Sequence, residues 1–183
     1  IGSRGSQLAL WQSEWAKAAI LKTRVDLDIE IQVIQTAGDV NLAASFLEIG
    51  SKGVFTKEVD EALLSGRTDF SVHSLKDLPT TMTAGLKLTA VSPRADVRDA
   101  LVSHDGLHLN QLRQGARVAT SSLRRQALLR SERPDLEILP LRGNVDSRLR
   151  KLETENLDAI VLASAGLERL GLDEHISERL DPE

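Results

Sequence analysis

The sequence predicts an α/β fold divided into two small domains. Short apolar or alternating runs of strand length recur between segments whose apolar residues have the 3.6-residue spacing of a helix. Strands that alternate with helices in this way are typical of layered α/β domains with largely parallel sheets. A polar stretch at residues 93–98 interrupts the alternation, which then begins again. We therefore expect domain 1 at residues 1–92, a hinge at 93–98 and domain 2 at 99–183.

Domain 1 is expected to begin with an amphipathic helix. Ser6, which follows Gly5, is a suitable N-cap for it. Residues 28–35 alternate between polar and apolar side chains, as in a half-buried strand. Further along, Thr56 can cap a second helix that ends at Gly66. In chain order we expect a helix at 8–22, a strand at 28–35, a loop at 36–53, a helix at 56–64, and strands at 70–73 and 86–91.

Domain 2 is expected to repeat one local pattern, in which a short strand leads through a polar turn into a helix. The regular alternation of helices with short strands favours largely parallel pairing. We expect strands at 100–103, 117–119, 137–141 and 157–162, and helices at 122–133, 145–152 and 165–170.

The composition is that of an ordinary folded protein, with 41% hydrophobic and 27% charged residues among 183. The absence of cysteine excludes disulfides, thiolate metal sites and a cysteine nucleophile within this chain. The longest apolar run, residues 159–167, is shorter than the roughly 18 residues that a membrane span needs. The start of the chain has no basic and apolar signal pattern. We expect a cytoplasmic protein without a membrane partner.

Positive charge is concentrated in one part of domain 2. The chain has 16 arginines and 7 lysines, and nine of the arginines lie in residues 113–150, where four acids leave a local charge of +5. Arginine is suited to bidentate recognition of carboxylate or phosphate. The net charge of −4 and the 3% aromatic content argue against a nucleic-acid partner. The cluster is therefore either a solvated face with ion pairs or a site for small anions.

Three helix starts combine arginine with serine or glycine. The residues are Arg4 and Ser6 at the first helix, Ser122, Arg124 and Arg125 after the strand at 117–119, and Arg142 and Arg148 around Gly143 after the strand at 137–141. Arginines in the first turn of a helix oppose its dipole, and a bound anion would remove that conflict. The side chains could instead simply point to water. If the two domains face each other, the three sites form a cradle for several anions.

The run H-S-L-K-D at residues 73–77 ends a predicted strand. Asp77 beside cations stays ionised, yet it could move a proton to or from a positively charged amine. The alternative is that Lys76 and Asp77 only form a turn. We assign His73 to the core, and we expect no metal site because the histidines lack ligand spacing.

Two further motifs have plainer interpretations. Trp11 and Trp15, four residues apart on a helix, are assigned to core or interface packing. The run G-S-K-G at residues 50–53 is too short for a phosphate loop, and its flexibility suits a mobile lid.

Six motifs in chain order resemble the porphobilinogen deaminase (hydroxymethylbilane synthase) family. They are S-R-G-S-Q-L-A-L, G-S-K-G-V-F-T-K-E, V-H-S-L-K-D-L-P, A-T-S-S-L-R-R-Q, L-R-G-N-V-D-S-R and A-G-L-E-R-L-G-L. The resemblance implies a transferase of porphyrin and haem biosynthesis. Such an enzyme condenses four porphobilinogen molecules, with loss of ammonia at each step, into the linear tetrapyrrole 1-hydroxymethylbilane. It also implies halves similar to those of periplasmic binding proteins, with a cleft between them.

The resemblance further implies roles for single residues. Asp77 matches the catalytic aspartate, which stabilises cationic pyrroles and assists proton transfer as the aminomethyl group leaves. Lys52 and Phe55 fall in the family's mobile loop. The matches to binding residues are Ser74, Lys76, Ser122, Arg124, Arg125, Arg142 and Arg148 for the cofactor, and Arg4, Ser6 and the elongation-linked Arg169 for the substrate.

The family's cofactor implies a longer protein than this chain. Family members carry a dipyrromethane, made from two porphobilinogen units and linked through a thioether to a cysteine in a third domain. This chain has no cysteine and stops at Glu183, so the third domain is absent from it. We expect the first two domains of a monomeric enzyme, inactive by themselves, with porphobilinogen and the growing oligopyrrole as partners.

An alternative function is a two-domain module that binds small anions such as carboxylates without catalysis. The fold alone does not separate the two, because both use paired α/β domains. Two features favour the enzyme, namely the lack of an export signal and the position of Asp77 near an arginine-rich crevice. A simple binder of carboxylates gains nothing from a carboxylate there.

Overall fold

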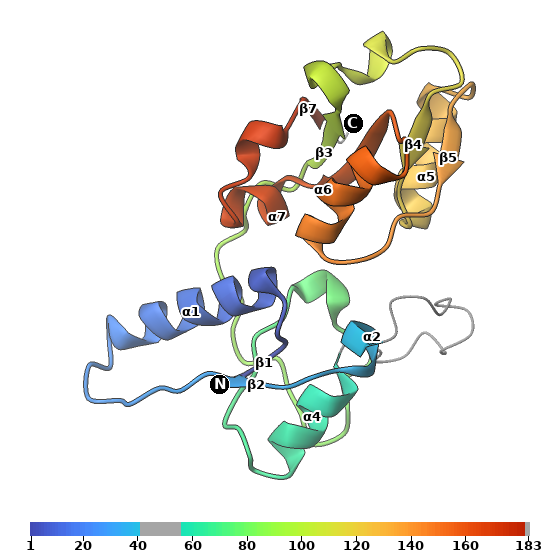
Figure 1. The fold of residues 1–183 in the computed structure, drawn as a ribbon. Coiled ribbons are helices and arrows are strands. Elements are labelled where there is room, and N and C mark those ends of the chain that lie inside the picture. The colour runs from blue at the N-terminus through green and yellow to red at the C-terminus, as the bar shows by residue number, and fades with distance from the viewer. Residues whose placement is uncertain (41–55, 182–183) are drawn as a thin grey trace. The chain divides into compact units, whose positions relative to one another are not determined.

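The computed structural model describes residues 1–40 and 56–181. The chain divides into two compact units, Ile1–Ser92 and Pro93–Glu183. Each unit combines helices with a sheet (Figure 1), which confirms the predicted α/β fold class.

Unit 1 is built on a small parallel sheet. Strand β1 (Gly2–Ser3) pairs in parallel with β2 (Gln32–Val33), and Ser71 adds a single parallel bridge to Gly2. The helices among its described residues are α1 (Gln7–Leu21), α2 (Ala37–Val40), α4 (Lys57–Leu64) and the 3₁₀ helix η1 (Leu75–Asp77).

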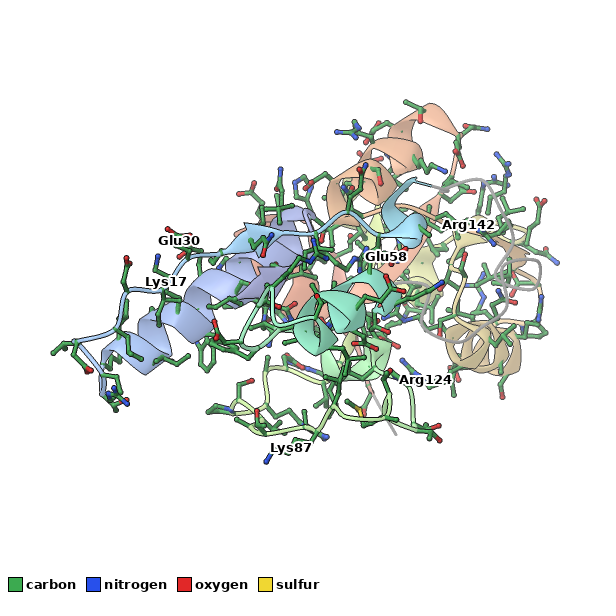
Figure 2. The ribbon with its side chains drawn as sticks, turned by 90° about the horizontal axis from the view of Figure 1, so that it is seen from below. Lys17, Glu30, Glu58, Lys87, Arg124 and Arg142 are labelled. Carbon is green, nitrogen blue, oxygen red and sulfur yellow. The ribbon has the colours of Figure 1, made fainter. Side chains whose placement is uncertain are left out.

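Local capping and a small core hold the helices of unit 1. The prediction that Ser6 caps α1 is confirmed, because its Oγ accepts a hydrogen bond from the Ala9 N–H at 3.3 Å. Helix α4 buries Val59 and Ala62 against Ile34, which follows β2. Its Glu58 (Figure 2) accepts a hydrogen bond from the Ala37 N–H at 3.0 Å, which links α4 to α2.

Several sequence predictions for unit 1 are wrong in detail. The strand expected at 28–35 shortens to β2, the one at 70–73 to the bridge at Ser71, and residues 86–91 are irregular. An alternating sequence forms a strand only where a neighbouring strand completes its hydrogen bonds, and the described residues supply few such partners. Thr56 precedes α4, but its buried hydroxyl makes no capping bond and finds no partner within the described ranges.

Unit 2 contains a five-stranded mixed sheet in the order β5-β4-β6-β3-β7. The strands are β3 (Asp99–Ser103), β4 (Arg117–Ala119), β5 (Glu137–Leu139), β6 (Ala159–Ala163) and β7 (Glu178–Leu180). Strand β4 pairs in parallel with β5 and β6, as predicted. The expectation of a largely parallel sheet fails on the other side, where β3 is antiparallel to both β6 and β7. The three-residue β7 carried too little pattern to be predicted.

Helices cover both faces of this sheet. Helices α5 (Leu123–Glu132), α6 (Val145–Thr154) and α7 (Ser164–Arg169) follow β4, β5 and β6 respectively. Because side chains alternate along a strand, β3 sends Ala100 and Val102 into one core and Leu101 into the other. The first core includes residues of α6 and α7, whereas the second includes Leu129 of α5. The short 3₁₀ helices of unit 2 are η2 (His104–Gly106), η3 (Leu109–Gln111) and η4 (Asp173–His175).

The described residues contain neither a membrane-spanning helix nor a metal-binding cluster. No helix in residues 1–40 and 56–181 is both long and apolar enough to cross a membrane. In the same ranges, no group of three or more histidine, aspartate or glutamate side chains is arranged to hold a metal ion.

Candidate functional site

A pocket in unit 1 lies between the start of α1 and the 3₁₀ helix η1. Its polar lining residues are Arg4, Ser6, Gln12, His73, Ser74 and Asp77. The sequence had singled out four of these from two distant segments, and the fold places them around one hollow.

A hydrogen-bonded pair joins the two walls of this pocket. The Gln12 Nε2 of α1 donates to the Ser74 Oγ at 2.9 Å. The backbone N–H of Asp77 donates to the Ser74 carbonyl at 2.9 Å, which closes the turn that carries the carboxylate. Asp77 itself is solvent-exposed and lines the pocket, whereas its exposed neighbour Lys76 lies outside the lining. The pocket therefore offers an accessible carboxylate on a fixed turn.

His73 lies in the pocket wall and is half-buried, which corrects its assignment to the core. Its Nε2 lies 3.1 Å from the Ser71 Oγ. Burial lowers the pKa of His73 below the ordinary value of 6.5, although the nearby charges of Asp60 and Asp77 oppose that shift. The imidazole is therefore neutral at neutral pH.

A second set of predicted residues gathers in unit 2, where β4 and β5 end. The Ser121 Oγ donates to the Leu141 carbonyl at 2.7 Å and accepts from the Leu141 N–H at 2.9 Å, so the two strand ends are clamped together. Ser122 caps α5, and its Oγ accepts from the Arg125 N–H at 3.5 Å. Parallel strands present their carboxyl ends at one edge, where open α/β sheets bind ligands.

The turn between β5 and α6 needs its glycine. Gly143 has a φ of +112°, and a Cβ at this position would overlap the Ser147 Oγ. Asn144 caps α6 by accepting from the Ser147 N–H at 2.9 Å, while the Arg148 Nε donates to the Gly143 carbonyl at 2.7 Å. Arg142 and Arg148, both half-buried, thus flank a rigid turn beside the end of β4.

Asp99 is the main addition that the structure makes to this set. Its carboxylate accepts a hydrogen bond from Arg124 at 2.7 Å and another from Arg125 at 2.8 Å. Figure 2 shows Arg124 and Arg142 among the side chains of the molecule. The two neighbouring arginines of α5 therefore do not simply point to water, because both donate to one carboxylate of the protein.

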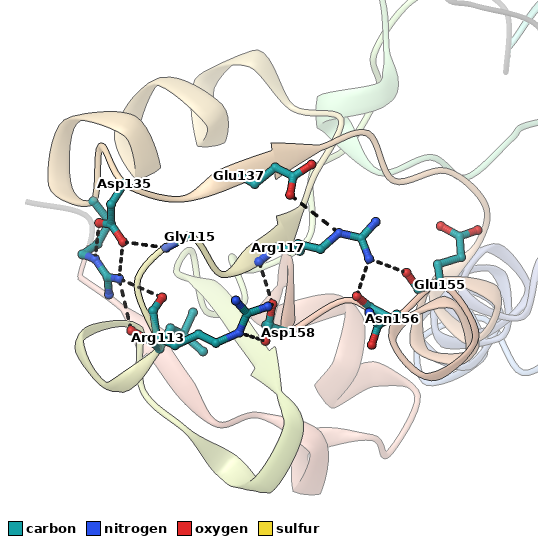
Figure 3. Close-up of polar contacts among 10 residues, drawn as sticks. Arg113, Gly115, Arg117, Asp135, Glu137, Glu155, Asn156 and Asp158 are labelled. Atoms are coloured by element: carbon teal, nitrogen blue, oxygen red, sulfur yellow. Dashed lines mark hydrogen bonds and ion pairs between the residues drawn. The ribbon is translucent and has the colours of Figure 1, made fainter.

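The opposite end of the same sheet also carries arginines (Figure 3). Arg113 forms a bidentate pair with Asp158, with nitrogen–oxygen distances of 3.0 and 2.9 Å. Arg117 donates through Nη1 to the carbonyls of Glu155 and Asn156, and its backbone N–H donates to Asp158. Burial raises the pKa of Asp158, but these donors lower it by more, and the net pKa lies below the ordinary value.

Arg133 closes a second network at that end. Its guanidinium donates to both oxygens of Asp135 at 2.7 Å and to the carbonyls of Leu109 and Leu112 at 2.6 and 3.1 Å. The hydrogen bond with Arg133 lowers the pKa of Asp135 to about 2. Arginines at this end are thus engaged in holding loops to the sheet.

Of the remaining predicted residues, one lies in α7 and two lie outside the described residues. Arg169 is the last residue of α7 and is half-buried. Lys52 and Phe55, with the expected lid at 50–53, lie outside the described residues. Trp11 and Trp15 are not core residues, because they are 38% and 43% exposed.

Three residues of these groups were missed by sequence reasoning. Gln12 follows Leu8 by four residues and Ala9 by three, and all three line the pocket, so helical periodicity could have placed it on their face of the helix. His73 directly precedes Ser74, but it was assigned to the core because its neighbours in the predicted strand are apolar. Asp99 could not be assigned to this group from the sequence, because its position depends on the antiparallel direction of β3, which no local sequence pattern indicates.

Comparisons with known proteins agree with the motifs. All of residues 1–183 match a family model described as "Porphobilinogen deaminase, dipyromethane cofactor binding domain". A curated porphobilinogen deaminase of Syntrophotalea carbinolica is 51% identical over 98% of this chain and 57% of its own length. Those of Pelobacter propionicus and Campylobacter hominis are 49% and 50% identical, over 100% and 96% of this chain and 59% and 57% of their own lengths. The chain thus spans under two thirds of these relatives, and it belongs to the porphobilinogen deaminase family.

Proposed function

We propose that the protein containing this chain is a hydroxymethylbilane synthase, a transferase that condenses four porphobilinogen molecules and releases one ammonia at each step. The observation that carries the proposal is the position of Asp77, whose exposed carboxylate lines a pocket together with Arg4 and Ser6. This places a group able to interact with an amine beside a group able to bind a carboxylate. Porphobilinogen has both an aminomethyl group and two carboxylates.

Asp77 supplies the negative charge for the reacting centre. Loss of ammonia leaves positive charge on the pyrrole, and a nearby carboxylate stabilises that charge as it develops. The same carboxylate can pass a proton between the pyrrole and the departing amine. Ser74 and Gln12 hold the turn that carries Asp77, so the carboxylate does not have to be ordered during the reaction.

The arginines of unit 2 fit the acidic cofactor named in the family description. A dipyrromethane made from two porphobilinogen units carries several carboxylates, and Arg124, Arg142 and Arg148 lie where β4 and β5 end. Arg125 adds a buried Nε that has no hydrogen-bond partner within the described part of the chain. When bound, the cofactor supplies a pyrrole ring to which substrate can be joined. Its covalent attachment must lie elsewhere, because these 183 residues contain no cysteine.

The test uses the protein expressed from its complete gene. Asp77→Asn removes the charge and keeps the shape of the side chain, so we expect normal folding with turnover of porphobilinogen reduced by about a hundredfold or more. The matched control is Asp28→Asn, which changes an exposed carboxylate outside the pocket and should leave turnover unchanged. Turnover is followed by the release of ammonia and the formation of a linear tetrapyrrole.

Two results would contradict the proposal. Near-normal tetrapyrrole formation by Asp77→Asn would remove the role of the aspartate. Absence of turnover in the unmodified protein, together with absence of a covalent pyrrole by intact mass and Ehrlich staining, would favour a carboxylate-binding module without catalysis.

A further inference from the structure

Arg124 and Arg125 share one acceptor although they differ strongly in exposure. The Arg124 Nη2 lies 2.7 Å from the Asp99 Oδ2, and the Arg125 Nη2 lies 2.8 Å from the Asp99 Oδ1. The side chains of Asp99 and Arg125 are each 11% exposed, whereas that of Arg124 is 62% exposed. One largely buried carboxylate therefore holds one largely buried and one accessible guanidinium.

The direction of β3 is what brings Asp99 to this place. Asp99 is the first residue of β3, and it pairs with Ala163, the last residue of β6. On its other side it pairs with Leu180 of β7. The backbone of Asp99 is thus fixed between two strands, at the edge where β4 and β6 end and α5 begins.

Arg125 is anchored more firmly than Arg124. Its Nη1 also donates to the Val161 carbonyl of β6 at 3.0 Å, so its guanidinium is tied to both the sheet and Asp99. Arg124 is joined to Asp99 through a single nitrogen. A guanidinium has five N–H donors, so most of those of Arg124 can still meet a ligand while its position is restrained.

The charges leave this cluster ready for an anion. Two guanidinium groups and one carboxylate give a local excess of one positive charge, at the start of a ten-residue helix whose dipole disfavours cations. A ligand carboxylate on Arg124 would neutralise the excess. Restraining Arg124 beforehand lowers the side-chain entropy that binding would otherwise cost.

We propose that Asp99 is a positioning residue that holds Arg124 in place to bind a carboxylate of the ligand, while Arg125 anchors the carboxylate of Asp99 to the sheet. The identity of the ligand as an acidic pyrrole rests on the proposed function. The positioning of Arg124 by Asp99 does not rest on the proposed function, so binding of any small dicarboxylate can test it.

The experiment measures binding of glutarate to cofactor-free protein, expressed from the complete gene in cells that make no porphobilinogen. Titration is followed through the arginine Nε–H resonances in NMR spectra. Asp99→Asn should weaken glutarate binding about tenfold, the effect expected when a charged restraint is lost. Asp99→Glu keeps the charge and should restore binding to within about threefold. The matched control is Asp158→Asn, which removes a carboxylate that serves Arg113 and Arg117 at the opposite end of the sheet and should leave binding unchanged.

A double-mutant cycle separates positioning from general damage to the fold. If Asp99 acts through Arg124, then Arg124→Gln and the double variant Arg124→Gln/Asp99→Asn should bind glutarate equally weakly. Additive losses, equal or tighter binding by Asp99→Asn, or an equal loss in Asp158→Asn would overturn the proposal. Should Asp99→Asn fail to fold, the ¹⁵N relaxation of Arg124 in the unmodified protein decides. Order comparable to that of Arg125 supports positioning, and a freely mobile Nε–H overturns it.

Because glutarate is not a pyrrole, the two proposals can fail separately. Loss of deaminase activity in the loaded, unmodified protein would defeat the proposed function and leave the glutarate result standing. Failure of the glutarate cycle would remove the role of Asp99 without affecting that of Asp77.

Discussion

The two ends of the sheet in unit 2 hold arginines in different surroundings. At the end where β4 begins, Arg113, Arg117 and Arg133 bind carboxylates and backbone carbonyls of their own unit (Figure 3). At the end where β4 finishes, Arg124 is 62% exposed and shares Asp99 with Arg125. The number of arginines is therefore a poor guide to how many guanidinium groups remain accessible to a ligand, whereas their position relative to the strand direction is informative.

The physical difference lies in the available acceptors. Asp135 and Asp158 each lie beside the loops that enter the sheet, and each accepts from an arginine and from a backbone N–H. These networks stabilise the fold and leave no clear role for a ligand. At the opposite end, one carboxylate serves two arginines, and the remaining donors of Arg124 face solvent.

Loss of Arg133 should have the largest effect on stability. Arg133→Met removes hydrogen bonds to Asp135 and to the carbonyls of Leu109 and Leu112, and we expect the free energy of unfolding to fall by about 2 kcal/mol. Glutarate affinity should not change. Denaturant unfolding of the protein from its complete gene measures the free energy of unfolding. If Arg133→Met weakened glutarate binding without loss of stability, the assignment of a structural role to the arginines at this end of the sheet would be wrong.

Acid should reveal the same network with a smaller effect. Because the pKa of Asp135 is about 2 in the folded protein and ordinarily 3.8, its contribution to stability is present above about pH 4 and is lost as the pH falls through 2. Asp135→Asn should therefore show a flatter decline in stability between pH 4 and pH 2. Hydrogen exchange at the amides of β4 and β5 reports this dependence of stability on pH. If Asp135→Asn left the decline between pH 4 and pH 2 unchanged, the ion pair of Arg133 and Asp135 would not stabilise unit 2.

Arg124→Gln should have the smallest effect on stability and a clear effect on binding. The side chain is largely exposed, and exposed ion pairs contribute about 0.5 kcal/mol, so the unfolding midpoint should barely move. Glutarate binding by the cofactor-free protein should be clearly weakened. A marked fall in the midpoint would place Arg124 with the structural arginines at the other end.

Helix positions and the turns at their starts could be predicted because their signals are local. The expected helix at 8–22 is observed as Gln7–Leu21, with Ser6 as its cap, since apolar spacing and capping need only neighbouring residues. The turn that brings Ser122 to the end of a strand follows in the same way from strand, turn and helix signals.

Strand partners and ion-pair partners could not be predicted because they are distant in sequence. Arg113 pairs with Asp158, 45 residues away, and Arg124 pairs with Asp99, 25 residues away. In the sequence, Arg113 and Arg124 belong to one basic cluster, and no local feature separates them. Only the fold assigns a carboxylate to each end, because β3 runs antiparallel to β6 and brings Asp99 to one end, while β6 runs parallel to β4 and brings Asp158 to the other.

We propose that acidic ligand groups bind where β4 and β5 end. The most direct measurement is a crystal structure of the protein from its complete gene, with its pyrrole cofactor bound. We expect cofactor carboxylates within hydrogen-bond distance of Arg124, Arg142 or Arg148, with Asp99 still paired to Arg125. Carboxylates bound instead at Arg113, Arg117 or Arg133, with their internal pairs broken, would contradict the account.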